Sequence, residues 1–203
     1  MTDTIDARST ALIIVDLQND FLAPGGAYDR GGAGNPRARE LPARIAPLAR
    51  ALKAAGGYVA ASQFTLWPDA HGEPMVTSHL RRLRPFLARG DFRPGSHGHE
   101  TVAELAGLVD ASFWKVAYSA FFQTQLDWVL RRAGIDNVIV CGIVTNGGVA
   151  STARDAHMRD YHVTVLADGC AAPTPAMHEA ALADLKTVAD VRDCADVLSG
   201  LAA

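Results

Sequence analysis

Cysteine is scarce in this sequence, and long apolar runs are absent from it. The three cysteines, Cys141, Cys170 and Cys194, are an odd number at wide spacings, which favours neither a disulfide framework nor a four-ligand zinc site. No apolar run approaches the roughly 20 residues that cross a bilayer, and residues 1–6 lack the basic flank and apolar stretch of a secretion signal. We therefore expect a cytoplasmic protein without a membrane partner.

The sequence also lacks a large excess of either basic or acidic residues. The chain has 19 lysine and arginine residues against 22 aspartate and glutamate residues, for a net charge of -3. That balance leaves no basic surplus to attract the phosphates of nucleic acids, so we expect a small-molecule partner. Of the 203 residues, 49% are hydrophobic, which is enough to build one sizeable core. The simplest organisation is a single domain over residues 1–203.

Short apolar runs alternate with segments of helical periodicity along the chain. Near-continuous apolar strands linked by helices predict a parallel sheet covered on both faces, because each crossover packs a helix against the sheet. The predicted fold class is therefore α/β, with three layers, α/β/α. The strands are expected at residues 11–15, 58–62, 111–115, 137–141, 162–167 and 188–191, and the helices at 42–55, 124–133, 149–159, 176–185 and 195–201.

Three segments, residues 11–21, 114–121 and 141–156, resemble motifs of the isochorismatase-like hydrolase superfamily, which also contains nicotinamidases and carbamoylsarcosine-type amidases. The resemblance implies a Rossmann-like sheet of six parallel strands in the order 3-2-1-4-5-6. It also implies a non-proline cis peptide bond between Ile143 and Val144. Ligands of such sheets bind beyond the carboxyl ends of the strands where the strand order reverses, here between the first and fourth strands.

Two matched segments converge on that crevice. Asp16 ends the first strand, and residues 143–148 leave the fourth strand and enter a helix. Lys115 ends the third strand, which lies about 10 Å from the first at the usual strand spacing. We therefore expect the lysine to reach inward, or its loop to bend back. Considered alone, Asp16 is as consistent with a turn cap as with catalysis, and Lys115 is more typical of a solvated strand end. The matching residues that follow each of them favour a functional role for both.

Gly148 separates this chain from the amidases that it resembles. In those enzymes a cysteine nucleophile stands at this position, the aspartate takes its proton, and the lysine supports the developing charges. Cys141 lies in an apolar strand and is expected to be a core thiol, and the sequence positions no base beside Ser119, Thr145 or Ser151. The covalent route therefore has no nucleophile. On sequence alone Gly147 and Gly148 are also consistent with a flexible turn before a helix, but within the matched motif they indicate a site remodelled by the removal of a side chain.

The isochorismatases themselves carry glycine at the position of Gly148, and their branch implies chemistry without a covalent intermediate. There the aspartate acts as a general acid, which requires that burial raise its pKa. By this resemblance Asp16, Lys115 and Gly148 form the catalytic site, and neither a metal nor another cofactor is expected. Substrate contacts are expected from Gln63, which stands where nicotinamidases begin a metal motif, and from Phe21, Val144, Thr145 and Phe121.

Two features differ from the isochorismatases. Val144 stands where those enzymes carry an aromatic residue, and the arginine that binds their substrate has no counterpart at the same spacing. Isochorismate is therefore not the expected substrate.

The connection over residues 64–110 is only loosely similar to the family. Arg81, Arg82 and Arg84 are either replacement anion contacts or a solvated helix face. The histidines of this connection are not expected to bind a metal. We expect the connection to cover the crevice or to pack against another subunit of a homodimer or homotetramer.

Three functions remain open from the sequence. The first is a metal-free hydrolase that uses Asp16 as acid or base to activate water on a small anionic substrate. The second is a cysteine amidase, for an amide, urea or carbamate, that is inactivated by Gly148. The third is a non-catalytic protein that binds a small molecule in the crevice.

Overall fold

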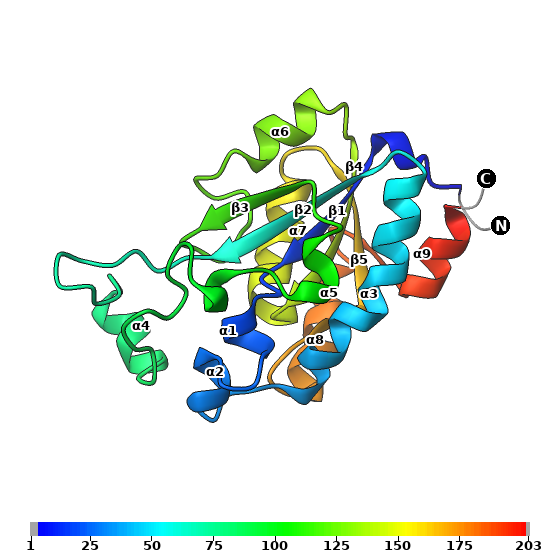
Figure 1. Ribbon diagram of the computed structural model, residues 1–203. Coiled ribbons are helices and arrows are strands. Elements are labelled where there is room, and N and C mark those ends of the chain that lie inside the picture. The colour runs from blue at the N-terminus through cyan, green and yellow to red at the C-terminus, as the bar shows by residue number, and fades with distance from the viewer. Residues whose placement is uncertain (1–3, 202–203) are drawn as a thin grey trace.

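The computed structural model describes residues 4–201 and contains a single six-stranded parallel sheet within them. The strand order β3-β2-β1-β4-β5-β6 confirms the predicted order, and β1 lies at the reversal (Figure 1). All five neighbouring pairs are parallel. The strands are β1 (Thr10–Val15), β2 (Tyr58–Phe64), β3 (Ala111–Lys115), β4 (Asn137–Ile143), β5 (His162–Ala171) and β6 (Asp190–Arg192).

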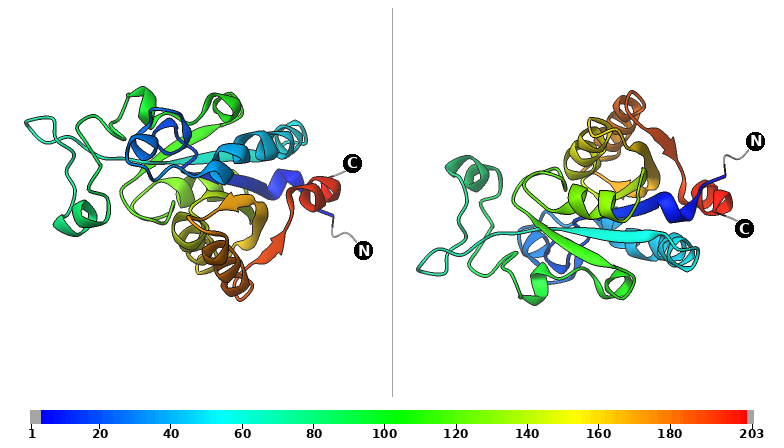
Figure 2. Two further views of the ribbon diagram at one scale, coloured as in Figure 1. Left: turned by 90° about the horizontal axis from the view of Figure 1, so that it is seen from below. Right: turned by 90° about the horizontal axis from the view of Figure 1, so that it is seen from above.

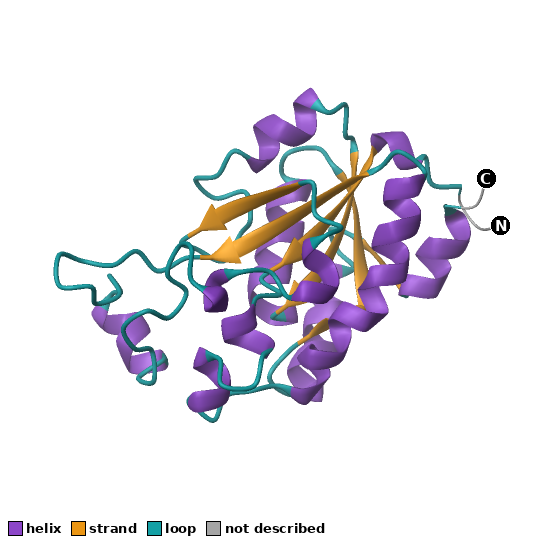
Figure 3. Cartoon of the chain, in the orientation of Figure 1, coloured by secondary structure: helices purple, strands orange, loops and turns teal. Residues whose placement is uncertain are grey.

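Helices cover both faces of the sheet, as expected for parallel crossovers (Figures 2 and 3). One face carries α3 (Pro36–Ala54), α5 (Ala103–Ala106) and α9 (Cys194–Gly200), and the other carries α6 (Leu126–Arg132), α7 (Ala150–His157) and α8 (Pro175–Leu185). The two ends of the described chain meet where the Ile5 amide donates to the Gly200 carbonyl at 2.9 Å. None of the helices in residues 4–201 combines the length and apolar character needed to cross a bilayer.

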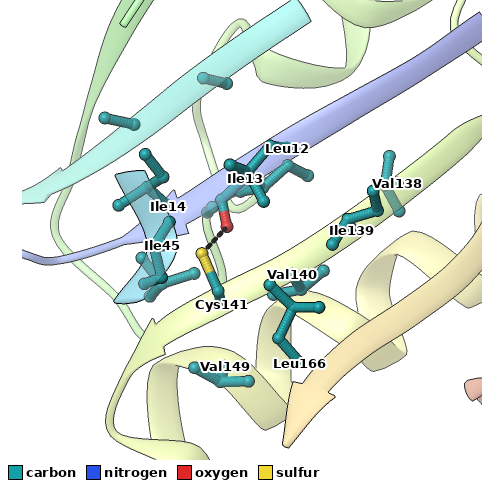
Figure 4. Packing of buried hydrophobic residues seen from close by; sticks show 14 of the residues in the cluster. Leu12, Ile13, Ile14, Ile45, Val138, Ile139, Val140, Cys141, Val149 and Leu166 are labelled. Atoms are coloured by element: carbon teal, nitrogen blue, oxygen red, sulfur yellow. Dashed lines mark hydrogen bonds between the residues drawn. The ribbon is translucent and has the colours of Figure 1, made fainter. Parts of the chain in front are cut away.

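The core lies on both sides of β1, whose six residues are all buried. Ile45 of α3 packs near Ile14 and Cys141, whereas Val149 and Leu166 lie on the opposite side of β4 (Figure 4). The Cys141 thiol is fully buried and contacts the Ile13 carbonyl oxygen at 3.7 Å. Burial raises the pKa of this thiol well above its usual value, so it stays protonated and unreactive.

Helix α3 begins at Pro36, not at residue 42 as predicted. Asn35 caps it by accepting hydrogen bonds from the amides of Arg37 and Ala38, and proline is well suited to the first helical position. Pro42 lies inside this helix, so the proline that we took as its start is not its boundary. The predicted helix over residues 149–159 is also wrong at its start, because a π-helical turn (Thr145–Val149) precedes α7.

The connection between β2 and β3 is partly folded and projects beyond the carboxyl ends of the strands. It contains α4 (Ser78–Leu83), a 3-10 turn (His97–His99) and α5, and α4 lies away from the sheet (Figure 1). Below β1, α1 (Asn19–Leu22) and α2 (Ala27–Arg30) pack against the same connection. A second, smaller core joins them, formed by Ala27, Leu66, Leu87 and Phe92.

Gly142 is required by the close approach of β4 to β1. Its φ is +113°, and a Cβ at this position would lie 2.1 Å from the Val15 carbonyl oxygen. We expect Gly142→Ala to lower the free energy of unfolding by about 2–3 kcal/mol, measured by urea denaturation. Gly107→Ala is the control, because a Cβ there meets nothing within 4 Å. Equal stabilities of the two variants would contradict this account.

Candidate active site

Asp16 is positioned by the end of β1 and by its neighbour β2. Its φ is +57°, a left-handed conformation that aspartate and asparagine tolerate better than most residues. Val15 pairs in register with Ser62, and the Ser62 hydroxyl donates to Asp16 Oδ1 at 2.8 Å. The carboxyl group therefore turns towards β2 instead of into solvent. The sequence reasoning missed Ser62, because its role depends on the register between the two strands.

Lys115 reaches inward from β3 to the same carboxyl group. Its Nζ lies 2.7 Å from Asp16 Oδ2 and also donates to the carbonyl oxygens of Ala117 and Tyr118 at 2.9 and 3.1 Å. The ammonium group thus has three partners. Exposure of the side chains is 1% for the lysine and 8% for the aspartate, so the ion pair is buried and only its acidic member touches solvent.

Burial raises the pKa of Asp16 above its ordinary value, and the neighbouring Lys115 and Ser62 offset only part of this effect. Both contacts to its oxygens come from donors, which suits the ionised carboxylate. A carboxylate with a raised pKa takes up a proton more readily than an exposed aspartate does. The group therefore has the properties of a general base that becomes a general acid once it is protonated.

Position 148 adjoins this carboxylate. A Cβ on Gly148 would lie 3.5 Å from Asp16 Oδ2, so any side chain at this position would begin beside the ion pair. The same Cβ would lie 2.8 Å from the Ile143 carbonyl oxygen and 2.9 Å from Val15 Cγ1, both too close for carbon. The backbone around Gly148 is therefore packed for glycine. The peptide bond between Ile143 and Val144, which leads into this turn, is cis, as the resemblance implies.

Ser119 and Thr145 each have a base beside them, contrary to our expectation. The Ser119 hydroxyl donates to Asp155 Oδ2 at 2.6 Å. Thr145 Oγ1 lies 2.8 Å from Nδ1 of His178, a residue in the first turn of α8 that the sequence reasoning missed. Burial lowers the pKa of His178, and the charge of Arg37 adds to this effect, so the imidazole favours its neutral form. The Thr145 side chain is fully buried and contacts α8 through His178. No sequence signal connects the two residues, which are 33 positions apart.

The other expected contacts are divided between different parts of the molecule. Gln63 follows Ser62 and so points to the opposite, α3-facing side of the sheet, where its Nε2 donates to the His99 carbonyl oxygen at 3.2 Å. Phe121 is buried against Tyr161, which immediately precedes β5, and so lies towards the amino ends of the strands. The structure does not bring either side chain to Asp16.

Phe21 and Val144 lie closer to the carboxyl ends. The Phe21 ring packs against Tyr28 and Phe92, with ring centroids 4.6 Å apart in each pair. Val144 precedes the π-helical turn and is partly buried against the core. A Cβ on Gly147 would lie 2.9 Å from Val144 Cγ2 and 3.2 Å from the Tyr118 ring. Tyr118, 61% exposed, is therefore a further residue beside the turn that the sequence reasoning did not identify.

The histidines of the connection lie apart from the ion pair. His99 Nε2 is 2.9 Å from the Thr65 hydroxyl, and burial lowers the pKa of this imidazole. Across residues 4–201 there is no group of three or more histidine, cysteine or acidic side chains with the arrangement of a metal site.

Comparison with known proteins identifies the family. The isochorismatase domain model matches residues 10–196. The chain is 33% identical over 195 residues to the ureidoacrylate amidohydrolase RutB of Caulobacter vibrioides, covering 90% of this chain and 86% of that protein. A cysteine hydrolase from Pseudomonas syringae superposes with a TM-score of 0.82 at 28% identity, covering 97% of this chain and 94% of the other. Nicotinamidase PncA from Bacillus subtilis gives 0.75 at 28% identity, with coverages of 91% and 100%. The chain belongs to the isochorismatase-like superfamily of hydrolases.

Proposed function

We propose that this protein hydrolyses a small anionic molecule by activating water with Asp16, supported by Lys115, without a cysteine nucleophile. The observation that carries the proposal is the position of Asp16 Oδ2, which lies 2.7 Å from Lys115 Nζ and 3.5 Å from the point where a side chain at 148 would begin. In this proposal a water molecule lies beside Asp16 Oδ2, in the space that the end of a longer side chain at 148 would take.

Glycine at position 148 leaves the Asp16 carboxylate without a side chain on this side, because a Cβ there would begin 3.5 Å from Oδ2. In the proposed reaction a water molecule donates one hydrogen bond to Asp16, which leaves a lone pair for attack. As the new carbon–oxygen bond forms, Asp16 takes the proton, and it passes that proton to the leaving group when the bond to the leaving group breaks. The Lys115 ammonium group stabilises the negative charge that develops on the substrate.

An isotope experiment tests this route. The wild-type protein is incubated in H₂¹⁸O with a panel of small carboxylates that carry an amide, ureido, carbamate or vinyl ether group. We expect one ¹⁸O atom in the hydrolysed product and no mass change in the intact protein, because water attacks the substrate directly. A covalent adduct on the protein during turnover, or no hydrolysis of any member of the panel, would reject the proposal.

The relatives favour a second candidate, a cysteine amidase that has lost its nucleophile. RutB of Caulobacter vibrioides is named as an amidohydrolase, and the P. syringae structure is described as a cysteine hydrolase. If this candidate were correct, Gly148→Cys would restore hydrolysis of amides or ureas and give an acyl adduct detectable by intact mass.

We expect Gly148→Cys to gain no amidase activity, because its Cβ would lie too close to the Ile143 carbonyl oxygen and to Val15 Cγ1. The same contacts should lower the free energy of unfolding by about 1–3 kcal/mol, measured by urea denaturation. Gly148→Ala is the matched control, since it adds the Cβ without the sulfur. Its free energy of unfolding should fall by a similar amount. Amidase activity in the cysteine variant alone would favour the second candidate.

A further inference from the structure

The segment over residues 78–93 is strongly basic in a chain whose net charge is -3. It contains five arginines and one acidic residue, Asp91, which is already paired with Arg30 at 2.5 Å. Within the described part of the chain, none of these five arginines has a carboxylate oxygen within 4.0 Å. The segment thus holds cationic groups without anionic partners. The arginines are Arg81, Arg82, Arg84, Arg89 and Arg93.

Arg84 differs from the other four because it is partly buried, whereas they are exposed. Its Nε donates to the Tyr28 hydroxyl at 3.0 Å, and its Nη1 donates to the Leu83 carbonyl at 2.9 Å. The remaining nitrogen, Nη2, makes no hydrogen bond to residues 4–201. By contrast, Arg82 is exposed, and its one hydrogen-bond contact within residues 4–201 is to His79 Nδ1, at 3.4 Å. Arg84 is therefore a preorganised cation with a donor still available.

An aromatic wall connects Arg84 to the ion pair. The Tyr28 ring packs on Phe21, whose centroid lies 6.2 Å from that of Phe64, and the Lys115 Nζ lies 6.0 Å from the Phe64 ring. Burial raises the pKa of Tyr28, the hydrogen bond and the charge of Arg84 lower it, and the negative charge of Asp16 raises it. Apolar rings of this kind exclude water and strengthen the attraction of a nearby guanidinium for an anion.

We propose that Arg84, oriented by Tyr28, binds the carboxylate of the substrate while the hydrolysed group lies at Asp16 and Gly148. A planar guanidinium suits a carboxylate because it can donate two parallel hydrogen bonds. The aromatic wall would contact an apolar spacer between the two groups of the substrate. The substrate class is therefore a carboxylic acid in which an apolar spacer separates the carboxylate from the hydrolysable group. This inference rests on the proposed function, whose anionic substrate it specifies.

Binding can be measured separately from turnover. The probes are N-carbamoyl-β-alanine and its neutral terminal amide, titrated by calorimetry into the wild-type protein and into Arg84→Gln, Arg84→Lys, Tyr28→Phe and Arg82→Gln. We expect Arg84→Gln to weaken binding of the carboxylate about 10- to 100-fold and of the neutral amide less than about 2-fold, because only the carboxylate uses the guanidinium. Arg84→Lys should recover part of the loss, Tyr28→Phe should show a smaller loss of the same selectivity, and Arg82→Gln should leave both affinities unchanged.

The two proposals fail in different ways in this experiment. Equal losses for the two probes in Arg84→Gln, no loss for either, or a wild-type protein that fails to prefer the carboxylate would overturn the Arg84 site. Selective binding of the carboxylate through Arg84, with no hydrolysis of any compound in the panel, would instead leave the subsite standing and reject the proposed function.

Discussion

Asp16→Asn is expected to reduce kcat/KM by about 10²- to 10⁴-fold, the usual contribution of a positioned acid–base group. Asparagine tolerates the φ of +57° and keeps an oxygen that can accept a hydrogen bond, but it cannot take a proton from water. The rate constants are measured on whichever substrate the isotope experiment identifies. Thermal unfolding of the same samples shows whether the variant is folded.

The dependence of the rate on pH provides a second measure of the same role. Burial raises the pKa of Asp16 above its ordinary value of 3.8, and the proposed base must be ionised. The rate should therefore fall as the pH drops through that raised pKa, and the acid limb should disappear in the asparagine variant.

Asp160→Asn is the matched control for this experiment. Asp160 also has a left-handed φ, +61°, but it is exposed and lies between α7 and β5. Its substitution should leave kcat/KM unchanged. An Asp16→Asn protein with wild-type kcat/KM, or an acid limb at or below pH 3.8 in the wild type, would contradict the role assigned to Asp16.

Lys115→Met is expected to lower the free energy of unfolding by about 3–5 kcal/mol, because it leaves a buried carboxylate without its cation. The double variant Lys115→Met with Asp16→Asn should regain much of this loss, since neither charge then remains. Urea denaturation of the wild type, the two single variants and the double variant gives the coupling energy between the residues.

The loss of stability in Lys115→Met should also depend on pH. Without the lysine, the folded-state pKa of Asp16 lies still further above its unfolded value, so the folded state binds a proton that the unfolded state releases. The stability of this variant should therefore rise as the pH falls towards 3.8. Lys53→Met, which removes a more exposed ion pair with Asp110, should cost about 1 kcal/mol or less. Additive losses in the double variant would show that the buried pair is not coupled.

The order of the elements, the parallel sheet and the site at its carboxyl edge follow from the sequence. Apolar strands without alternation imply burial on both faces, and parallel strands place their carboxyl ends at one edge. Asp16 and Gly148 each follow such a strand, so the sequence predicts that they meet, and the structure has them adjacent. The absence of a thiol at position 148 is likewise a property of the sequence alone.

Only the tertiary structure decided which side chains surround Asp16, Gly148 and the turn before α7. Lys115 was expected near Asp16, but whether it would reach the carboxyl group was open, and Ser62, His178 and Tyr118 were not identified at all. Gln63 was expected at the site and instead lies one residue beyond Ser62 on β2, where it points to the other face of the sheet and donates to the His99 carbonyl oxygen. Adjacent strand residues face opposite sides, so a prediction of one position fails unless the register is known. The register comes from packing between segments far apart in the chain, which local sequence patterns do not encode.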